Sequence, residues 1–263
     1  MSCAYPVYEV KCENKRLVLV TDIHHCHGDW YETQSDDRMN LLCSCLKEAH
    51  EQKPFDAIVT LGDYSLDFWK YQVGGSWLWN PPVSYTDDFV KKYVPQMPAP
   101  FYMIPGNHEQ YGHEDWLRIT GKPREYVIVY GDYVLVMLDT FAGELDPKVH
   151  SDGCYTGINA ELLSAVLEDY PEKKIILCAH DIYLERESEE ARRLICESRQ
   201  ILCAFTGHTH RENTLLLPDA WRNLPVFYCG DFSYNLGARR QKNWGYRVLE
   251  FTARGVSTEY ITA

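Results

Sequence analysis

Five short polar segments, each placed directly after an apolar run, constrain the fold of this 263-residue chain more than any other feature. The polar segments are Asp22-Ile23-His24, Gly62-Asp63, Gly106-Asn107-His108-Glu109, Ala179-His180 and Gly207-His208-Thr209-His210. The apolar runs before them are Leu17–Val20, Ala57–Leu61, Phe101–Ile104, Ile175–Cys178 and Ile201–Phe205. Such short runs, rich in β-branched residues, predict strands covered on both faces, although periodicity alone does not separate them from buried helix. Sites in layered α/β folds assemble at the carboxyl ends of strands, so we expect the polar segments to converge.

The polar segments offer seven side chains of metal-binding type. They are Asp22, His24, Asp63, Asn107, His180, His208 and His210. Neutral imidazoles with carboxylate or amide oxygens suit ions such as zinc, manganese or iron. Seven ligands are too many for one tetrahedral ion, and they suit two ions that share a carboxylate and lie about 3.5–4 Å apart. The alternative, seven buried side chains satisfied by hydrogen bonds alone, would require a coincidence at five strand ends.

The order of the five segments resembles the calcineurin-like metallophosphoesterases, and most closely the pattern of the class III cyclic nucleotide phosphodiesterases. Asp-x-His, Gly-Asp, Gly-Asn-His-Glu, a single His and Gly-His-x-His follow one another from Asp22 to His210, over most of the chain. The resemblance implies an α/β fold, a four-layer α-β-β-α sandwich of two mixed sheets flanked by helices. It also implies hydrolysis of a phosphate ester with two metal ions.

Carried over residue by residue, the resemblance implies two metal sites that share one carboxylate. The first ion would be held by Asp22, His24 and His210, and the second by Asn107, His180 and His208. Asp63 would bridge the two ions, and the family's catalytic acid falls on His108.

The chemistry of such a site follows from its charges. Two dications outweigh two carboxylates, so the site can hold an anionic phosphoryl group although the chain carries a net charge of −12. Water bridging the ions would have its pKa lowered from about 15.7 toward neutrality, which supplies hydroxide for direct attack. His108 is the candidate donor of a proton to the leaving group. We therefore expect a small phosphodiester or phosphomonoester as substrate, and two divalent ions, or a mixed-valence iron-containing pair, of manganese, iron or zinc.

Several positions depart from the better-known branches of this family. The protein serine/threonine phosphatases have Asp and then Arg where this chain has Leu66 and Asp67, which leaves open whether Asp67 orients His108. The purple acid phosphatases have a Tyr ligand at the position of Leu66 and lack a histidine equivalent to His24. The fourth segment continues with Asp181, whereas the family usually has a proline shortly after its histidine. These departures argue against both branches.

Two other classes of function stay open as alternatives, a nuclease and a non-catalytic metal-binding scaffold for a protein partner. The acidic balance of the chain, with a pI of about 5.3, disfavours binding of long nucleic acid, which relies on clustered Lys and Arg. The intact His108 argues against the scaffold. The expected partner is a small phosphate ester, with a nucleotide as one candidate, and no oligomeric state is predicted.

One domain over residues 1–263 is expected, in a cytoplasmic protein. No apolar stretch of eighteen residues occurs, the first six residues do not form a signal peptide, and the ten cysteines show no Cys-x-x-Cys spacing. An aromatic-rich insertion at about 66–99 carries Trp69, Tyr71, Trp77, Trp79 and Tyr85. These rings either stack on a substrate base or pack against the scaffold or a second subunit.

The remaining elements are predicted from periodicity and turn signals. We expect helices over 36–52, capped by Asp36 or Asp37, and over 159–170. Strands 126–129 and 134–139 should form a hairpin around Gly131-Asp132, and late strands are expected at 225–228, 246–251 and 258–261.

Several residues near the polar segments have more than one interpretation. Glu109 either hydrogen-bonds a neighbour of the metal site or begins a helix, and Arg211 either clamps a phosphate or is a surface cation. His25, Cys26 and His27 extend the first segment into a His/Cys cluster. We expect them to be spare polar residues of a loop, and the alternatives are a ligand role or contact with substrate, above all by His25.

Overall fold

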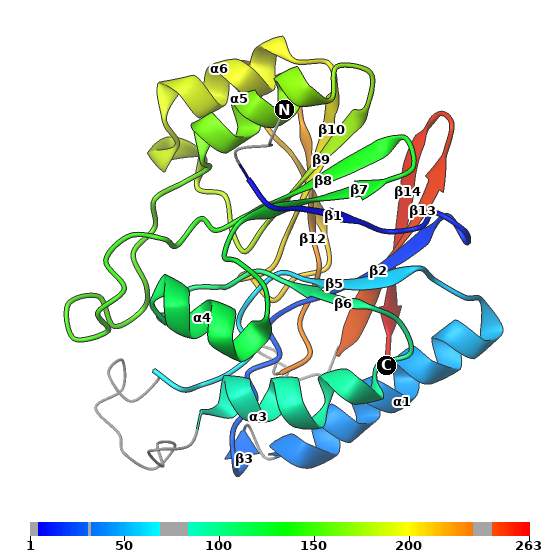
Figure 1. Ribbon diagram of the computed structural model, residues 1–263, viewed down its shortest axis with the longest axis vertical. Helices are drawn as coiled ribbons and strands as arrows, with labels where there is room; N and C mark the ends of the chain where they lie inside the picture. Colours follow the sequence, from blue (N-terminus) through cyan, green and yellow to red (C-terminus); the bar gives the residue numbers. More distant parts are fainter. Residues whose placement is uncertain (1–4, 31–32, 69–83, 234–243) are drawn as a thin grey trace.

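Two large β-sheets form the centre of the molecule (Figure 1). The computed structural model describes residues 5–30, 33–68, 84–233 and 244–263. The seven-stranded sheet has the order β1 (Val7–Glu9), β7 (Tyr126–Tyr130), β8 (Tyr133–Leu138), β9 (Lys174–Ala179), β10 (Ile201–Thr206), β12 (Pro225–Tyr228) and β11 (Thr214–Leu216). The five-stranded sheet has the order β14 (Gly255–Thr262), β13 (Gly245–Thr252), β2 (Arg16–Val20), β5 (Ala57–Thr60) and β6 (Phe101–Met103). Both sheets mix parallel and antiparallel pairs, as expected.

Helices cover the outer face of each sheet (Figure 1). The helices are α1 (Ser35–Gln52), α3 (Tyr85–Lys92), α4 (His113–Thr120), α5 (Ala160–Asp169) and α6 (Glu189–Glu197). Short 3-10 turns η1 (Val94–Gln96), η2 (Leu184–Arg186) and η3 (Asp219–Trp221) and a small ribbon, β3 (Asp29–Trp30) with β4 (Thr33–Gln34), complete the described elements. In Figure 1, α5 and α6 lie beyond the seven-stranded sheet, whereas α1, α3 and α4 lie beyond the five-stranded sheet.

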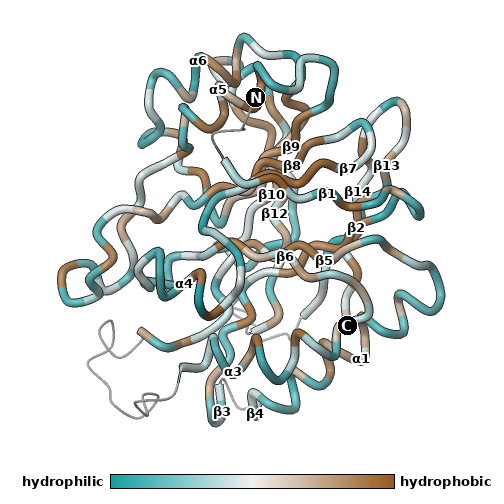
Figure 2. The backbone as a smooth tube through the Cα atoms, viewed as in Figure 1, coloured by the Kyte–Doolittle hydropathy of each residue, from teal (hydrophilic) through white to brown (hydrophobic). Residues whose placement is uncertain are grey.

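The apolar side chains of the strands point alternately to two faces, and this produces three separate cores. In β9, Ile176 and Cys178 pack between the sheets, whereas Ile175 and Leu177 pack under α5 and α6. In β5, Val59 packs between the sheets and Ile58 packs under α1. The apolar strands stand out in the middle of Figure 2, and polar residues concentrate on the outer helices and turns. Strands buried on both faces explain the continuous apolar runs and confirm the four-layer sandwich.

The strand order brings the five polar segments to one edge of the two sheets. β2, β5 and β6 are parallel neighbours in one sheet, and β9 and β10 are parallel neighbours in the other. The carboxyl ends of parallel neighbours lie at the same edge. Gly62 approaches the next segment so closely that a Cβ there would lie 2.5 Å from the backbone of Gly106.

Most predicted elements agree with the structure, with one clear error. The expected helix 36–52 is α1, but the residue before its first turn is Gln34, which makes no side-chain capping hydrogen bond. Asp36 and Asp37 lie inside the first turn, where a carboxylate interacts favourably with the helix dipole without capping. The prediction of Asp36 or Asp37 as the cap was therefore wrong.

The second helix and the hairpin are as predicted. The side chain of Asn159 accepts a hydrogen bond from the backbone of Leu162 at 3.1 Å and so caps α5. β7 and β8 pair through Tyr130 and Tyr133, and Gly131 in the turn has a φ of 57°. β13 and β14 run longer than expected because they pair from Gly245↔Thr262 to Thr252↔Gly255.

Most of the aromatic insertion lies outside the described residues, including Trp69, Tyr71, Trp77 and Trp79. Tyr85 is described: it begins α3 and is buried in a small apolar cluster with Cys26, Trp30 and Leu66. For this one ring, packing against the scaffold is confirmed.

The cysteines and helices of the described ranges have two further properties. The nine cysteines in these ranges are free thiols. None of the described helices combines the length and the apolar character that crossing a bilayer requires.

Candidate metal centre

The eight predicted site residues converge where the parallel strands of both sheets end. The loops after β2, β5 and β6 carry Asp22, His24, Asp63, Asn107 and His108, and the loops after β9 and β10 carry His180, His208 and His210. Three groups of donor atoms within 4.8 Å of one another result: Asp22, His24, His210; Asp63, His180, His208; and His24, Asp63, His108. The convergence expected from the strand ends is therefore present.

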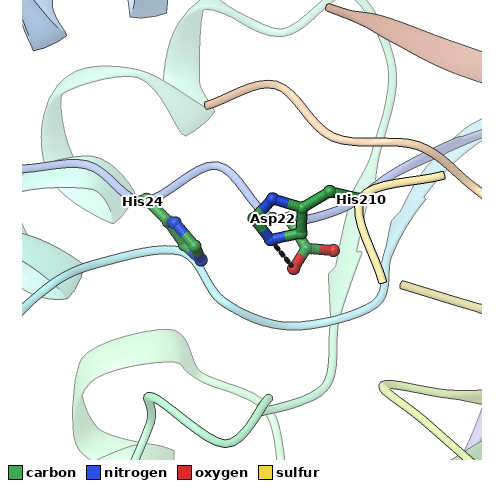
Figure 3. Close-up of side chains that lie close together, drawn as sticks. All are labelled: Asp22, His24 and His210. Carbon is green, nitrogen blue, oxygen red and sulfur yellow. Dashed lines mark ion pairs between the residues drawn. The ribbon is translucent and has the colours of Figure 1, made fainter. Parts of the chain in front are cut away.

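The first group joins the two sheets. The Nε2 atom of His210 lies 3.0 Å from Oδ1 of Asp22, and His24 lies beside this pair (Figure 3). The other carboxylate oxygen of Asp22 accepts hydrogen bonds from the Thr21 hydroxyl at 2.7 Å and from the backbone N–H of His208 at 2.9 Å. These two donors orient the carboxylate and leave Oδ1 directed at His210.

In the second group, a histidine nitrogen faces two oxygen atoms, and this arrangement is stable only with positive charge. Nδ1 of His180 lies 2.6 Å from the carbonyl oxygen of Leu61, so that nitrogen carries a proton and donates it. Its Nε2 then faces Oδ1 of Asn107 at 2.9 Å and Oδ2 of Asp63 at 3.2 Å. An imidazole lone pair directed at two oxygens is favourable only if Nε2 is protonated or a cation lies between them.

The pKa values of the site residues also indicate that positive charge is required. Burial alone would lower the pKa of His180, but the charge of Asp63, the hydrogen bond to that carboxylate and the charge of Asp22 together raise this pKa to about 10. Burial likewise opposes ionisation of Asp22, yet the neighbouring His210 lowers the pKa of that carboxyl to about 2. Without a metal, histidines must therefore carry the positive charge that these carboxylates require. Imidazole nitrogens and carboxylate oxygens collected around that charge fit divalent metal ions.

Asp63 connects the two groups. Its Oδ2 atom lies 3.2 Å from Nε2 of His24 and 3.2 Å from Nε2 of His180. Its Oδ1 atom accepts a hydrogen bond from the backbone N–H of His108 at 3.0 Å. The side chain of His108 lies beside this carboxylate, with Nε2 at 3.7 Å from Oδ2, beyond hydrogen-bond range.

The backbone at this site adopts a conformation that side chains normally avoid. Five residues of the site have positive φ, between 49° and 60°: Asp22, His24, Asp63, His208 and His210. Each such residue costs on the order of 1–3 kcal/mol and persists only where the surrounding structure imposes it. The strained residues are the same ones that direct donor atoms into the site, and their local sequence does not reveal this conformation.

Glu109 holds the loops after β5 and β6 together. Its buried carboxylate accepts hydrogen bonds from the backbone N–H groups of Gly106 and Asp63, both at 2.8 Å, and of Tyr64 at 2.9 Å. Burial, and then the charge of Asp63, raise the pKa of Glu109 to about 8, and these donors act in the opposite direction. The sequence left two roles open for Glu109, a hydrogen bond to a neighbour of the site and the start of a helix. The hydrogen bond is confirmed, and the helix is not, because α4 begins only at His113.

Two further polar side chains contact the site residues and were not found from the sequence. Asp152 accepts a hydrogen bond from Nδ2 of Asn107 at 2.8 Å, which turns the amide oxygen toward the histidines. The hydroxyl of Tyr183 lies 2.8 Å from Nε2 of His208. Asp152 lies in a loop 45 residues after Asn107 with no motif around it, so only the fold reveals the contact.

The three positions that the sequence left open are now placed. The carboxylate of Asp67 accepts hydrogen bonds from the backbone of Tyr85 at 2.7 Å and of Thr86 at 3.1 Å, so it stabilises the N-terminus of α3. Asp181 is buried, with one oxygen 3.9 Å from Nε2 of His208. The side chain of Arg211 is exposed.

Comparison with known proteins agrees with this geometry. Residues 15–212 match the family model of the calcineurin-like phosphoesterases. The chain therefore belongs to the calcineurin-like phosphoesterase family. The family is one of metal-dependent phosphoesterases, and it implies divalent metal ions.

Two similar solved structures are a phosphatase and a predicted phosphoesterase. A purple acid phosphatase from yellow lupin (Lupinus luteus) seeds superposes with a TM-score of 0.52 at 14% sequence identity, over 94% of this chain and 51% of that one. The chain thus spans about half the length of that phosphatase. A predicted phosphoesterase from Streptococcus pneumoniae gives a TM-score of 0.41 at 13% identity, over 94% of this chain and 88% of that one. A search of curated protein sequences finds no significant match.

The role of Glu109 gives a first prediction. Glu109→Gln replaces one acceptor oxygen with an amide NH2 group, a donor that faces backbone donors, so the free energy of unfolding should fall by about 1–3 kcal/mol. Metal content should fall as well, because the loops that carry Asp63 and Asn107 lose their common anchor. Urea unfolding and elemental analysis measure the two effects. Glu114→Gln, an exposed acidic residue in α4, is the control and should change neither. Wild-type stability in Glu109→Gln would contradict the anchoring role.

Proposed function

We propose that this protein hydrolyses a small phosphodiester or phosphomonoester with two metal ions, one in each group of donors, and with Asp63 as the shared ligand. The observation that carries the proposal is the position of Asp63, whose Oδ2 atom lies at the same 3.2 Å from a histidine of either group. When bound, two such ions supply an ionised water as nucleophile near neutral pH and neutralise charge on the phosphoryl oxygens.

The residues around Asp63 form two sets of ligands whose orientation is already fixed. Asp22, His24 and His210 would hold one ion, and Asn107, His180 and His208 the other. The tautomer of His180 is set by Leu61 and the amide of Asn107 is turned by Asp152, so both present the correct atom without rearrangement. Such preorganisation lowers the cost of building a charged site.

His108 is the proposed general acid. It stands at the edge of the site, its backbone tied to Asp63 and its ring centroid 5.1 Å from that of His24. The departing alkoxide needs a proton, and an imidazole beside the two groups is placed to donate it. Because His108 also groups with His24 and Asp63, a ligand role is the competing assignment, and the two make different predictions.

Aromatic rings beside the second group support a substrate with a flat apolar part, such as a nucleotide. The ring centroids of Phe141 and Tyr183 lie 5.9 Å and 6.0 Å from that of His208, and Tyr155 packs against both. Phe141 and Tyr155 are buried, so the half-buried Tyr183 is the ring of this set on which a base would stack, at about 1–3 kcal/mol. We therefore place the substrate's non-reacting part on the side of His208.

The proposal is tested with a panel of esters. p-Nitrophenyl phosphate, its bis-ester, cyclic nucleotides and oligonucleotides are assayed with the protein loaded with manganese, iron or zinc, and the metal content of the same samples is determined. We expect small esters to be hydrolysed faster than oligonucleotides, with two of the bound ions belonging to this centre. Faster degradation of oligonucleotides would indicate a nuclease, and no hydrolysis by metal-loaded protein would indicate the binding scaffold.

Replacing His108 distinguishes its two possible roles, general acid and metal ligand. His108→Ala should lower kcat by about 10²–10⁴-fold while the metal content stays at the wild-type value. The loss should be smaller for p-nitrophenyl esters, whose leaving group needs no proton, than for alkyl esters. His113→Ala, at the exposed start of α4, is the control. A matching loss of metal would assign His108 as a ligand, and unchanged turnover would remove it from the mechanism.

Replacing His180 tests the second group. His180→Ala should lower the metal content by about one ion per chain relative to wild type, because it removes an imidazole that faces both Asn107 and Asp63. Elemental analysis after dialysis against metal-free buffer measures this loss. Full retention of both ions by folded His180→Ala protein would contradict the assignment.

A further inference from the structure

A second cluster of metal-binding side chains lies outside the proposed catalytic centre. His25 and His27 follow the first polar segment, and Asp88 lies in α3. Oδ2 of Asp88 is 2.8 Å from Nε2 of His25 and 3.3 Å from Nε2 of His27. The three donor atoms lie within 4.8 Å of one another, and the cluster shares no residue with the two groups around Asp63.

The ring of His25 is held in one orientation. Its Nδ1 atom lies 2.9 Å from the hydroxyl oxygen of Ser35, which also accepts a hydrogen bond from the backbone of Cys26 at 3.1 Å. A hydroxyl can donate to Nδ1 or accept from it, so this contact persists when Nε2 binds a cation. Metal-binding histidines usually have their second nitrogen engaged in this way.

The spacing and accessibility of the three donors suit a tetrahedral ion. Zinc binds nitrogen and oxygen at about 2.0–2.2 Å, which places the ligand atoms of a tetrahedron about 3.3 Å apart. The His27–Asp88 distance of 3.3 Å already matches this spacing, and the His25–Asp88 distance needs only a small increase. His25 is buried, whereas the side chains of His27 and Asp88 are 39% and 30% exposed, so solvent can reach a fourth position.

The charges around the cluster also fit a dication. Two neutral imidazoles and one carboxylate leave part of the charge of a divalent ion uncompensated, and Asp36 adds negative potential at His25. Asp36 is itself paired with Lys92 at 3.1 Å, at the surface of the same helix pair. The rings of Tyr93 and Tyr85 pack at 5.3 Å from His25 and 4.8 Å from His27, and they shield two sides of the cluster.

We propose that His25, His27 and Asp88 form a third divalent-metal site, of the type that binds zinc, and that its ion fastens the loop bearing His24 to helix α3. His25 directly follows His24, so an ion held by His25 and Asp88 fixes the backbone next to a residue of the catalytic centre. The alternative is that no ion binds there and that the two imidazoles donate hydrogen bonds to Asp88.

Zinc stoichiometry distinguishes the two readings. Full-length protein is loaded with Zn²⁺, freed of excess ion and analysed for metal per chain, as wild type and as His27→Ala and Asp88→Asn. We expect both variants to hold one ion fewer than wild type. Asp87→Asn, which removes the neighbouring carboxylate on α3 that pairs with Lys91, is the matched control and should keep the wild-type count. A crystal of the zinc-loaded protein should show an anomalous peak between the three side chains.

The measured quantity is a difference from wild type, so it does not depend on how many ions the catalytic centre holds. His180→Ala should lose an ion there and keep the one that depends on Asp88. Equal zinc content in wild type, His27→Ala and Asp88→Asn would overturn the proposal. The cluster would then be held by hydrogen bonds alone. If Asp88→Asn fails to fold, His27→Ala decides alone, because His27 is exposed and its removal leaves the contact between His25 and Asp88 in place.

Discussion

The geometry of the candidate metal centre depends on one buried carboxylate, that of Asp63. It lies between histidines that come from different sheets, and each contact is 3.2 Å long. A carboxylate with so little exposure is costly unless positive charge surrounds it. The imidazoles of His24 and His180 occupy the two sides where such charge is required. The fold can therefore be understood as the arrangement that presents these two histidines to one oxygen.

The layered architecture meets this requirement through strand direction. β2, β5 and β6 end beside one another in one sheet, and β9 and β10 do so in the other. Because the cores on both faces of each sheet are continuous, the positions of the strand ends are rigidly determined. That rigidity allows the loops to hold residues at positive φ, where an isolated loop would relax.

The sequence predicted which polar side chains converge and missed several of the residues that orient them, for a physical reason. Strand ends and donor types are local properties, so Asp22, Asp63 and His180 can be recognised from their neighbours along the chain. Asp152 acts on Asn107 from a loop with no periodic pattern, and only the folded chain brings them to 2.8 Å. The capping error in α1 has a similar origin, since the helix begins directly after the β3–β4 ribbon, which sets its first residue.

Asp67 lies one residue after the position of an Asp in the protein serine/threonine phosphatases, and here it has a structural role. Its oxygens accept hydrogen bonds from the first backbone N–H groups of α3, and the Tyr111 hydroxyl adds another. A carboxylate with this many donors is committed to the helix N-terminus. Since Asp88 lies on that same helix, Asp67 also sets the position of the proposed third metal site. The loop after β5 thus supplies Asp63 to the catalytic centre and, through Asp67, holds α3 against the loop after β2.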